Sequence, residues 1–277
     1  MEARMHSEPM TTAPPILVTG GNGNLGSRVV AQLRAAGQDV RVMSRHPHAV
    51  EGIESVAGDL TTSDGVASAV AGIEVVVHLA GTAKGDGAKA RHLVVAATAA
   101  GVCHLVFISV VGADQIPMAG AVDRVMFGYF GEKHAAETAI AESGIPWTTL
   151  RATQFFDLSL VTAEAMAKLP LIPIPAGFKF QPIDADEVAA RLTELALGSP
   201  AGLVPEMGGP EIFDWADLVR AYLSAAGKHR PIVRVPTPGR AAAAIRAGAN
   251  LAPDRAVGRR TWQEFLAERV GRSVART

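Results

Sequence analysis

A single cysteine, Cys103, is present among the 277 residues, so the chain cannot form a disulfide within itself. Cys103 lies in a short apolar run, and we expect it to be buried at the edge of a strand. A chain without disulfides is suited to a reducing compartment, so we expect a cytoplasmic location.

An excess of charge of either sign is also lacking. Lys and Arg number 26 against 27 Asp and Glu, which gives a formal net charge of −1. That balance gives no reason to expect nucleic acid or an acidic membrane surface as a partner. No stretch of about 18 apolar residues occurs, so no transmembrane helix is expected.

The first fifteen residues contain no apolar signal core, so secretion is not expected. Residues 1–13 are predicted to be a disordered tail, and Met10 is an alternative start. His46 and His48 have a spacing that two metal ligands can share. Because no third ligand lies at a suitable spacing, we expect a loop and no metal site. No Ser/His/Asp nucleophile turn is present.

Short β-type runs alternate with alanine-rich helical patterns in the first half of the sequence. Strands are expected at 16–19, 40–43, 55–57, 75–79, 105–109 and 148–151, and helices near 25–36, 63–71, 88–100 and 131–143. This alternation predicts an α/β fold with a parallel sheet and right-handed crossovers.

The texture of the sequence changes after about residue 152, where prolines become frequent and strong strand patterns become fewer. Helices are still expected from near 184, and near 214–226 and 261–270. We therefore predict a nucleotide-binding domain over 14–152 and a smaller substrate lobe over 153–277. The segment near 181–190 is expected to pack back on the first domain.

The most informative segment is the glycine-rich turn at 19–26, which separates the first expected strand from the first expected helix. Gly20, Gly23 and Gly26 permit a tight turn, close approach of the backbone to phosphate, and close packing of helix on strand. The helix start offers free N–H groups and the positive end of its dipole to an anion. This context predicts a site for the pyrophosphate of a dinucleotide, at Gly20, Asn22, Gly23, Asn24, Leu25 and Gly26.

The nucleotide is predicted from the end of the second strand, which is expected to meet the adenosine ribose. Ser44 and Arg45 stand there, and a guanidinium suits the 2′-phosphate of NADP(H), which we favour over NAD. The alternative is that Arg45 is an ordinary solvated loop residue. Asp59 follows the third strand, where it either accepts from the adenine amino group or caps a helix or turn. The fourth strand ends in Ala80 and Gly81, which are small enough for a cofactor to lie against the sheet edge.

Tyr129 and Lys133 are four residues apart, which places a phenol and an ammonium on one face of a helix. A nearby lysine is expected to favour phenolate, lower the phenol pKa and make the group useful in proton transfer. The same lysine can bond a nicotinamide ribose. The alternative is two unrelated surface side chains.

These segments, together with 144–151, 181–189 and 209–215, resemble the atypical short-chain dehydrogenase/reductases. The resemblance is to the subgroup with NmrA-like and NAD(P)H-binding proteins, which includes quinone reductase-like members. It covers about residues 14–270 and implies a Rossmann-type doubly wound parallel sheet, NADP(H), and a substrate cleft between two lobes. It implies adenine contacts from Asp59 and Leu60, a nicotinamide-side loop that includes Thr153, and acid catalysis by Tyr129 helped by Lys133.

One departure from that family concerns the hydroxyl just after the fifth strand, which orients a substrate carbonyl. This chain has Ser109 followed by Val110 and Val111, so Ser109 either takes that role or bonds only to backbone. Carbonyl reduction is thereby left open. Reduction of a quinone depends less on a general acid, because its product is a stabilised hydroquinone anion. Correct positioning of cofactor and substrate can then be enough for hydride transfer.

Apolar side chains of the second lobe either line a pocket for a flat, greasy substrate or form ordinary core; they include Phe155, Phe156, Leu158, Leu160, Met166, Leu171, Ile172 and Ile174. We expect the core role for most of them. The leading hypothesis is an NADPH-dependent oxidoreductase that acts on an apolar or aromatic quinone or carbonyl compound, as a monomer or homodimer. The alternatives are a non-catalytic NADP(H)-sensing regulator of the NmrA type and a nucleotide-sugar epimerase or dehydratase.

Overall fold

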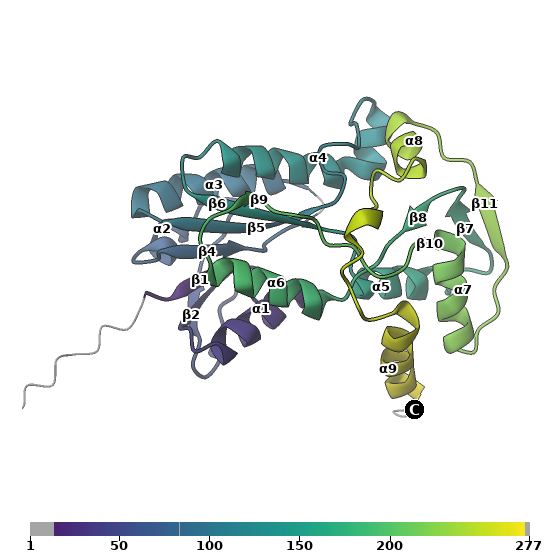
Figure 1. Ribbon diagram of the computed structural model, residues 1–277, viewed down its shortest axis with the longest axis horizontal. Helices are drawn as coiled ribbons and strands as arrows, with labels where there is room; N and C mark the ends of the chain where they lie inside the picture. Colours follow the sequence, from purple (N-terminus) through teal and green to yellow (C-terminus); the bar gives the residue numbers. More distant parts are fainter. Residues whose placement is uncertain (1–13, 83, 275–277) are drawn as a thin grey trace, which may run out of the picture.

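The computed structural model describes residues 14–82 and 84–274 (Figure 1). The tail predicted for residues 1–13 lies outside the described residues. The centre of the molecule is a seven-stranded sheet in the order β3-β2-β1-β4-β5-β6-β9, in which every neighbouring pair is parallel. Its strands are β1 Ile16–Thr19, β2 Val40–Ser44, β3 Glu54–Ala57, β4 Val75–His78, β5 His104–Val110, β6 Trp147–Ala152 and β9 Gly202–Leu203.

Helices cover both faces of this sheet (Figure 1). One face carries α1 Asn24–Ala35 and α6 Ala185–Leu197; the other carries α2 Val66–Val70, α3 Asp86–Ala100 and α4 Ala121–Ala141. Each helix layer shares a hydrophobic cluster with the strands, because side chains alternate between the two faces along a strand. The predicted doubly wound α/β fold is confirmed, and the strand order reverses between β1 and β4.

Helix α4 begins at Ala121, earlier than the expected start near residue 131. Gly128 and Gly131 interrupt the helical pattern, because glycine is a poor helix former. Tertiary contacts overrule that preference. The Asp123 carboxylate accepts from the Gly120 N–H at 3.2 Å and from the Ala241 N–H at 3.1 Å, which fixes the first turn against α8.

A second group of elements stands beside the carboxyl ends of the sheet strands (Figure 1). It contains α5 Phe156–Met166, β7 Ile172–Pro175, β8 Lys179–Phe180, β10 Phe213–Asp214, α7 Trp215–Ala225, β11 Ile232–Val235, α8 Arg240–Arg246 and α9 Trp262–Val274. Strand β8 pairs antiparallel with β10, and β7 pairs parallel with β11. Between β8 and β10 the chain returns to the central sheet, where α6 packs on α1 and β9 pairs with β6. A domain boundary at residue 152 stays a prediction.

The sequence pattern did not indicate α5, α8 or the short strands. Strand β7 shows why: Ile172 and Ile174 are buried, and they alternate with Pro173 and Pro175. Proline lacks an N–H for the ladder and argues against a central strand, but it is tolerated in a two-stranded sheet that has only edges.

Of the eight apolar residues considered for a substrate pocket, three are buried core, Phe155, Leu160 and Met166 pack partly buried against the core, and Leu158 and Leu171 are exposed. Phe156, Ile172 and Ile174 are buried with Trp262 and Phe265 in one cluster. The Phe156 ring lies 5.6 Å from the Trp262 ring and 5.2 Å from the Phe265 ring, between centroids. Burial of such aromatic rings stabilises the second group of elements.

The expectation for Cys103 is wrong, because this residue is exposed. Gly101 takes a left-handed conformation with a φ of 75° at the end of α3, and β5 begins only at His104. Val102, rather than Cys103, turns into the core between them. In the described part of the chain, no helix is long and apolar enough to cross a membrane, and no three His, Cys, Asp or Glu side chains gather in a way that could hold a metal ion.

Candidate functional site

The glycine turn between β1 and α1 is fixed by main-chain contacts. Gly20 has a φ of 72°, and a Cβ atom there would lie 2.8 Å from the Ala80 nitrogen. A Cβ atom on Gly26 would lie 2.0 Å from the Gly20 oxygen. The Gly23 N–H donates to that same oxygen at 2.9 Å. Glycine is therefore required at positions 20 and 26, as the sequence predicts.

The N-terminus of α1 is suited to bind an anion. Gly23 is its N-cap and supplies no side-chain hydrogen bond, and the first turn holds no acidic residue. The first N–H groups of a helix lack partners within the helix, so this end can donate to a phosphate.

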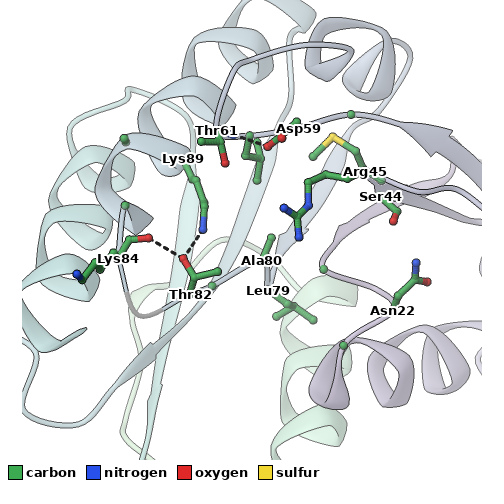
Figure 2. A pocket seen from close by; sticks show the side chains of 18 residues that line it. Asn22, Ser44, Arg45, Asp59, Thr61, Leu79, Ala80, Thr82, Lys84 and Lys89 are labelled. Atoms are coloured by element: carbon green, nitrogen blue, oxygen red, sulfur yellow. Dashed lines mark hydrogen bonds between the residues drawn. The ribbon is translucent and has the colours of Figure 1, made fainter. Parts of the chain in front are cut away.

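A cavity of about 530 Å³ opens beside this turn at the point where the strand order reverses (Figure 2). Such a reversal is where parallel α/β sheets bind their ligands. The predicted cofactor residues that line it are Gly20, Asn22, Gly23, Ser44, Arg45, Asp59, Leu60, Ala80 and Gly81. Lining residues that the sequence did not indicate include Met43, Thr61, Leu79, Thr82, Lys84 and Lys89. Lys133, which is also predicted to contact the cofactor, does not line it, and neither do Asn24, Leu25, Gly26 and Thr153.

The last four of these residues have other contacts. Leu25 belongs to the core under α1, and Gly26 permits the close approach to Gly20 described above. Asn24 accepts a hydrogen bond from Arg28 with both its side chain and its carbonyl. Thr153 is buried, and its hydroxyl donates to the Gln181 carbonyl.

The end of the cavity next to β2 carries a guanidinium. Arg45 extends from the end of β2 into the cavity (Figure 2), and it also borders an adjoining hollow of about 490 Å³. No carboxylate forms an ion pair with it among the described residues. Asp59 uses one oxygen to accept from the Thr61 N–H at 2.7 Å, which lowers its pKa. Asp59 thus caps a turn and also lines the cavity, and its contact with the adenine amino group stays a prediction.

Asp86, at the start of α3, connects this cavity to helix α4. Its carboxylate is buried and accepts from the Thr82 N–H at 2.7 Å. It pairs with Lys89 at 3.5 Å and with Lys133 at 3.3 Å. Sequence reasoning missed Asp86, because its partners come from segments that meet only in the folded chain.

Lys133 is held on several sides. It is 4% exposed and donates to the Ile108 carbonyl at 3.3 Å. Its ammonium lies 4.9 Å from the centroid of the Phe107 ring. A Cβ atom on Gly81 would lie 2.8 Å from the Lys133 nitrogen, so the lysine borders the small-residue end of β4. Desolvation lowers the Lys133 pKa, and Asp86 opposes that effect.

Tyr129 lies on the same face of α4 as Lys133, as the spacing predicts. The Lys133 nitrogen is 5.8 Å from the centroid of its ring. The expected lowering of the Tyr129 pKa is wrong, because desolvation, and then the Asp86 charge, raises this pKa to about 12. The residue nevertheless remains 39% exposed. Tyr129 therefore carries its proton at neutral pH and can act as a donor, not as a base.

Ser109 lies near the carboxyl end of β5, in register with Arg151 of β6. It is buried, and its hydroxyl oxygen has no hydrogen-bond partner in the part of the chain that the structure describes. The alternative of a bond to backbone is therefore wrong. An unpartnered buried hydroxyl is unusual and is typical of a group that bonds a ligand or water.

His78 fixes the ends of β1 and β4 beneath the cavity. Thr19 Oγ1 lies 2.7 Å from His78 Nδ1 and accepts weakly from the Leu79 and Ala80 N–H groups, at 3.3 and 3.4 Å. The hydroxyl hydrogen of Thr19 is thus free to donate to Nδ1. The His78 ring stacks on Phe107 at 5.4 Å. Desolvation, helped by the Lys133 charge, lowers the His78 pKa to about 3.

We expect His78 to make the protein acid-sensitive. Its folded pKa lies below the unfolded value of 6.5, so the unfolded chain binds the proton more tightly. The free energy of unfolding then falls as the pH drops from 6.5 toward 3, by up to about 1.4 kcal/mol per pH unit for this one group. Urea unfolding between pH 7 and 4.5 measures the slope. His78→Asn, which keeps an acceptor for Thr19, is expected to have a shallower slope; an unchanged slope would contradict this account.

Comparison with known proteins agrees with this geometry. The profile of the NAD(P)H-binding family matches residues 20–194. An NAD(P)H azoreductase of Xenophilus azovorans is 29% identical over 223 residues, which cover 77% of this chain and 74% of that protein. Each of the structures compared below, like this relative, is named a reductase or an oxidoreductase.

Two solved structures share the fold. An NADPH-dependent quinone oxidoreductase of Escherichia coli in complex with NADPH has a TM-score of 0.77 at 20% identity, over 91% of this chain and 99% of that chain. A triphenylmethane reductase of a Citrobacter species in complex with NADP(H) has a TM-score of 0.72 at 20% identity, over 92% of this chain and 99% of that chain. The predicted family, Rossmann-type fold and nicotinamide cofactor are confirmed. The chain belongs to the NAD(P)H-binding family.

Proposed function

We propose that this protein is an NADPH-dependent oxidoreductase that transfers hydride to a quinone or to a similar apolar, aromatic carbonyl compound. The observation that carries the proposal is that Gly81, which lines the cavity at the glycine turn, borders the buried Lys133, whose ammonium lies 5.8 Å from the ring centroid of the protonated Tyr129. The quinone oxidoreductase and azoreductase relatives support the same reaction class.

The residues present fit the cofactor. The uncapped start of α1 is suited to the pyrophosphate, and Arg45, which has no ion-pair partner among the described residues, is suited to the 2′-phosphate. The cofactor, when bound, supplies the hydride. Lys133 borders the sheet edge where Gly81 admits a ribose, and Asp86 holds that lysine in place.

Tyr129 would supply the proton. Reduction of a quinone to a hydroquinone takes one hydride and one proton at an oxygen, and a phenol that stays protonated at neutral pH can donate that proton. Water then returns a proton to the phenolate. The unpartnered Ser109 hydroxyl is suited to bond the acceptor oxygen. These roles for Tyr129, Lys133 and Ser109 stay proposals, as do the cytoplasmic location and a monomeric or dimeric state.

One observation favours the NADP(H)-sensing alternative. The Lys133 charge is paired with Asp86, so it does not activate Tyr129 as a base. A sensor needs the cofactor cavity and no activated phenol. No feature of the described residues favours the nucleotide-sugar epimerase or dehydratase.

A turnover assay with a matched variant separates these functions. We expect the protein to oxidise NADPH with naphthoquinones. In Tyr129→Phe we expect aromatic ketone reduction to fall at least about 100-fold, and quinone reduction to fall less, because positioned acid catalysis contributes about 10²–10⁴-fold where it is needed. Val125→Ala, a change at an exposed residue of the same helix face, is the control. Tight NADPH binding without turnover on a broad panel of quinones and ketones would favour the sensor.

Arg45 is expected to select NADPH over NADH. In Arg45→Ala, loss of a charge-assisted contact of about 1.5–3 kcal/mol should raise the Kd of NADPH about 10- to 100-fold. The Kd of NADH should change little, because NADH carries no 2′-phosphate. Cofactor fluorescence measures both constants, and Arg191→Ala on the exposed side of α6 is the control. An equal loss for both cofactors would show that Arg45 does not read the 2′-phosphate.

A further inference from the structure

A second, smaller cavity lies in the group of elements beside the sheet. It has a volume of about 220 Å³ and lies against α5, β8 and α7. Its lining includes Gln154, Leu158, Ser159, Phe180, Trp215 and Val219. A buried cavity of about 150 Å³ holds benzene, so this one has room for one or two fused rings.

Two of its walls are aromatic rings that meet at a corner. The Phe180 and Trp215 rings lie 5.0 Å apart between centroids, at an interplanar angle of 82°. A flat ligand can stack on one of these rings while its edge meets the other, and both arrangements are favourable for π systems. Leu158 is 60% exposed and lines the same cavity, so its apolar surface is available to a ligand.

One polar group in this apolar cavity has spare hydrogen-bonding capacity. The Nε2 atom of Gln154 is buried, and it has no hydrogen-bond partner among residues 14–82 and 84–274. The Thr162 hydroxyl, by contrast, already donates to the Leu158 carbonyl at 2.7 Å. A buried amide nitrogen without a partner is costly. Because Gln154 lines the cavity, a rotation of its amide would bring this nitrogen to a ligand oxygen.

The cavity lies at the sheet edge that also carries Ser109. Gln154 follows β6 by two residues, at the same edge of the sheet as Ser109. A row of rings also joins the cavity wall to α4: the Trp215 ring is 6.4 Å from Phe178, which is 6.0 Å from Phe127, between centroids. Phe127 precedes Tyr129 by two residues.

We propose that this cavity binds the planar ring of the electron-accepting substrate, and that the Gln154 amide donates to a carbonyl oxygen at the ring edge. This inference rests on the proposed function for its assignment of the ligand as a substrate. The ligand class is a quinone or aromatic carbonyl compound of one or two rings.

Three variants test the site. Gln154→Leu removes the amide at similar size. Ser159→Phe fills the cavity from α5, and Val161→Phe adds the same ring at an exposed position of that helix outside the cavity lining. The readouts are the KM for 2-methyl-1,4-naphthoquinone, the Kd of NADPH, and quenching of tryptophan fluorescence by the quinone without cofactor, with Trp215→Phe to assign the signal.

We expect the KM to rise about tenfold in Gln154→Leu and more in Ser159→Phe, with the NADPH Kd unchanged and Val161→Phe equal to the parent protein. Quenching should follow the same order and be largely lost in Trp215→Phe. Turnover with a KM that none of these variants alters would overturn the site and leave the proposed function standing. Absence of turnover, with quenching that Ser159→Phe abolishes, would support the site and reject the proposed function.

Discussion

Gly26→Ala is expected to raise the Kd of NADPH at least about 100-fold. The added Cβ atom would lie 2.0 Å from the Gly20 oxygen and 2.8 Å from the Gly20 carbonyl carbon, so it meets backbone that no side-chain rotation can move. The turn must therefore shift away from α1. Displacing two charge-assisted hydrogen bonds to the pyrophosphate, at about 1.5–3 kcal/mol each, accounts for this loss of affinity.

Two other glycine substitutions are expected to have smaller effects on the Kd of NADPH. Gly23→Ala places its Cβ atom 3.2 Å from the same oxygen, so a smaller rise of the Kd is expected. Gly128→Ala adds a Cβ atom with no atom within 4 Å, and alanine favours a helix, so no change in cofactor affinity is expected. Circular dichroism confirms that each variant is folded before cofactor titration. A folded Gly26→Ala protein with parental affinity would contradict the assignment of this turn as the pyrophosphate site.

Arg151→Met is expected to lower the free energy of unfolding by about 1.5–3 kcal/mol. Arg151 is buried and donates to both oxygens of Glu137, at 2.8 and 2.7 Å, and to Asp114 at 2.9 Å. Glu206 lies 3.9 Å away. Removal of the guanidinium leaves three partly exposed carboxylates close together without their shared cation, and Glu137, whose side chain is 12% exposed, loses two charge-assisted hydrogen bonds.

The pH dependence identifies the cause of this loss. Desolvation already raises the Glu206 pKa, and Arg151 opposes that rise, so without the arginine these carboxylates should hold protons more tightly in the folded state. The difference in the free energy of unfolding between the parent protein and Arg151→Met should therefore shrink as the pH falls from 7 to 5. Urea unfolding measures it, with Arg191→Met, an exposed ion pair at 3.0 Å, as a control expected to cost less than about 1 kcal/mol. A loss of unfolding free energy that does not depend on pH would indicate that lost side-chain packing, rather than lost charge pairing, is the cause.

The features that sequence reasoning predicted are those encoded locally. The sheet strands β1 to β6 follow short runs of β-forming residues bounded by turns, and the glycines at 20, 23 and 26 act within a single turn. Arg45 and the shared face of Tyr129 and Lys133 follow from strand ends and helical spacing.

The features that it missed depend on contacts between distant segments. The role of Asp86 is visible only in the folded chain, where the packing of α3 against α4 brings Lys133 to it. The same carboxylate helps to raise the Tyr129 pKa, which was expected to be lowered. The start of α4 is set by Asp123 contacts with α8, which lies more than a hundred residues later. The cavity beside Gln154 is built from three short elements, of which only α7 had a clear pattern.

The return of the chain to the central sheet as α6 and β9 has a consequence for folding during synthesis. The six strands β1 to β6 are complete at Ala152, but the apolar side of α1 gains its cover from α6, and the edge strand ends at Leu203. At about 5–20 residues per second, the ribosome needs about 3–10 s to add the intervening residues. During that interval the apolar side of α1 lacks the cover that α6 provides, and transiently exposed apolar surface of this kind makes a growing chain prone to aggregation.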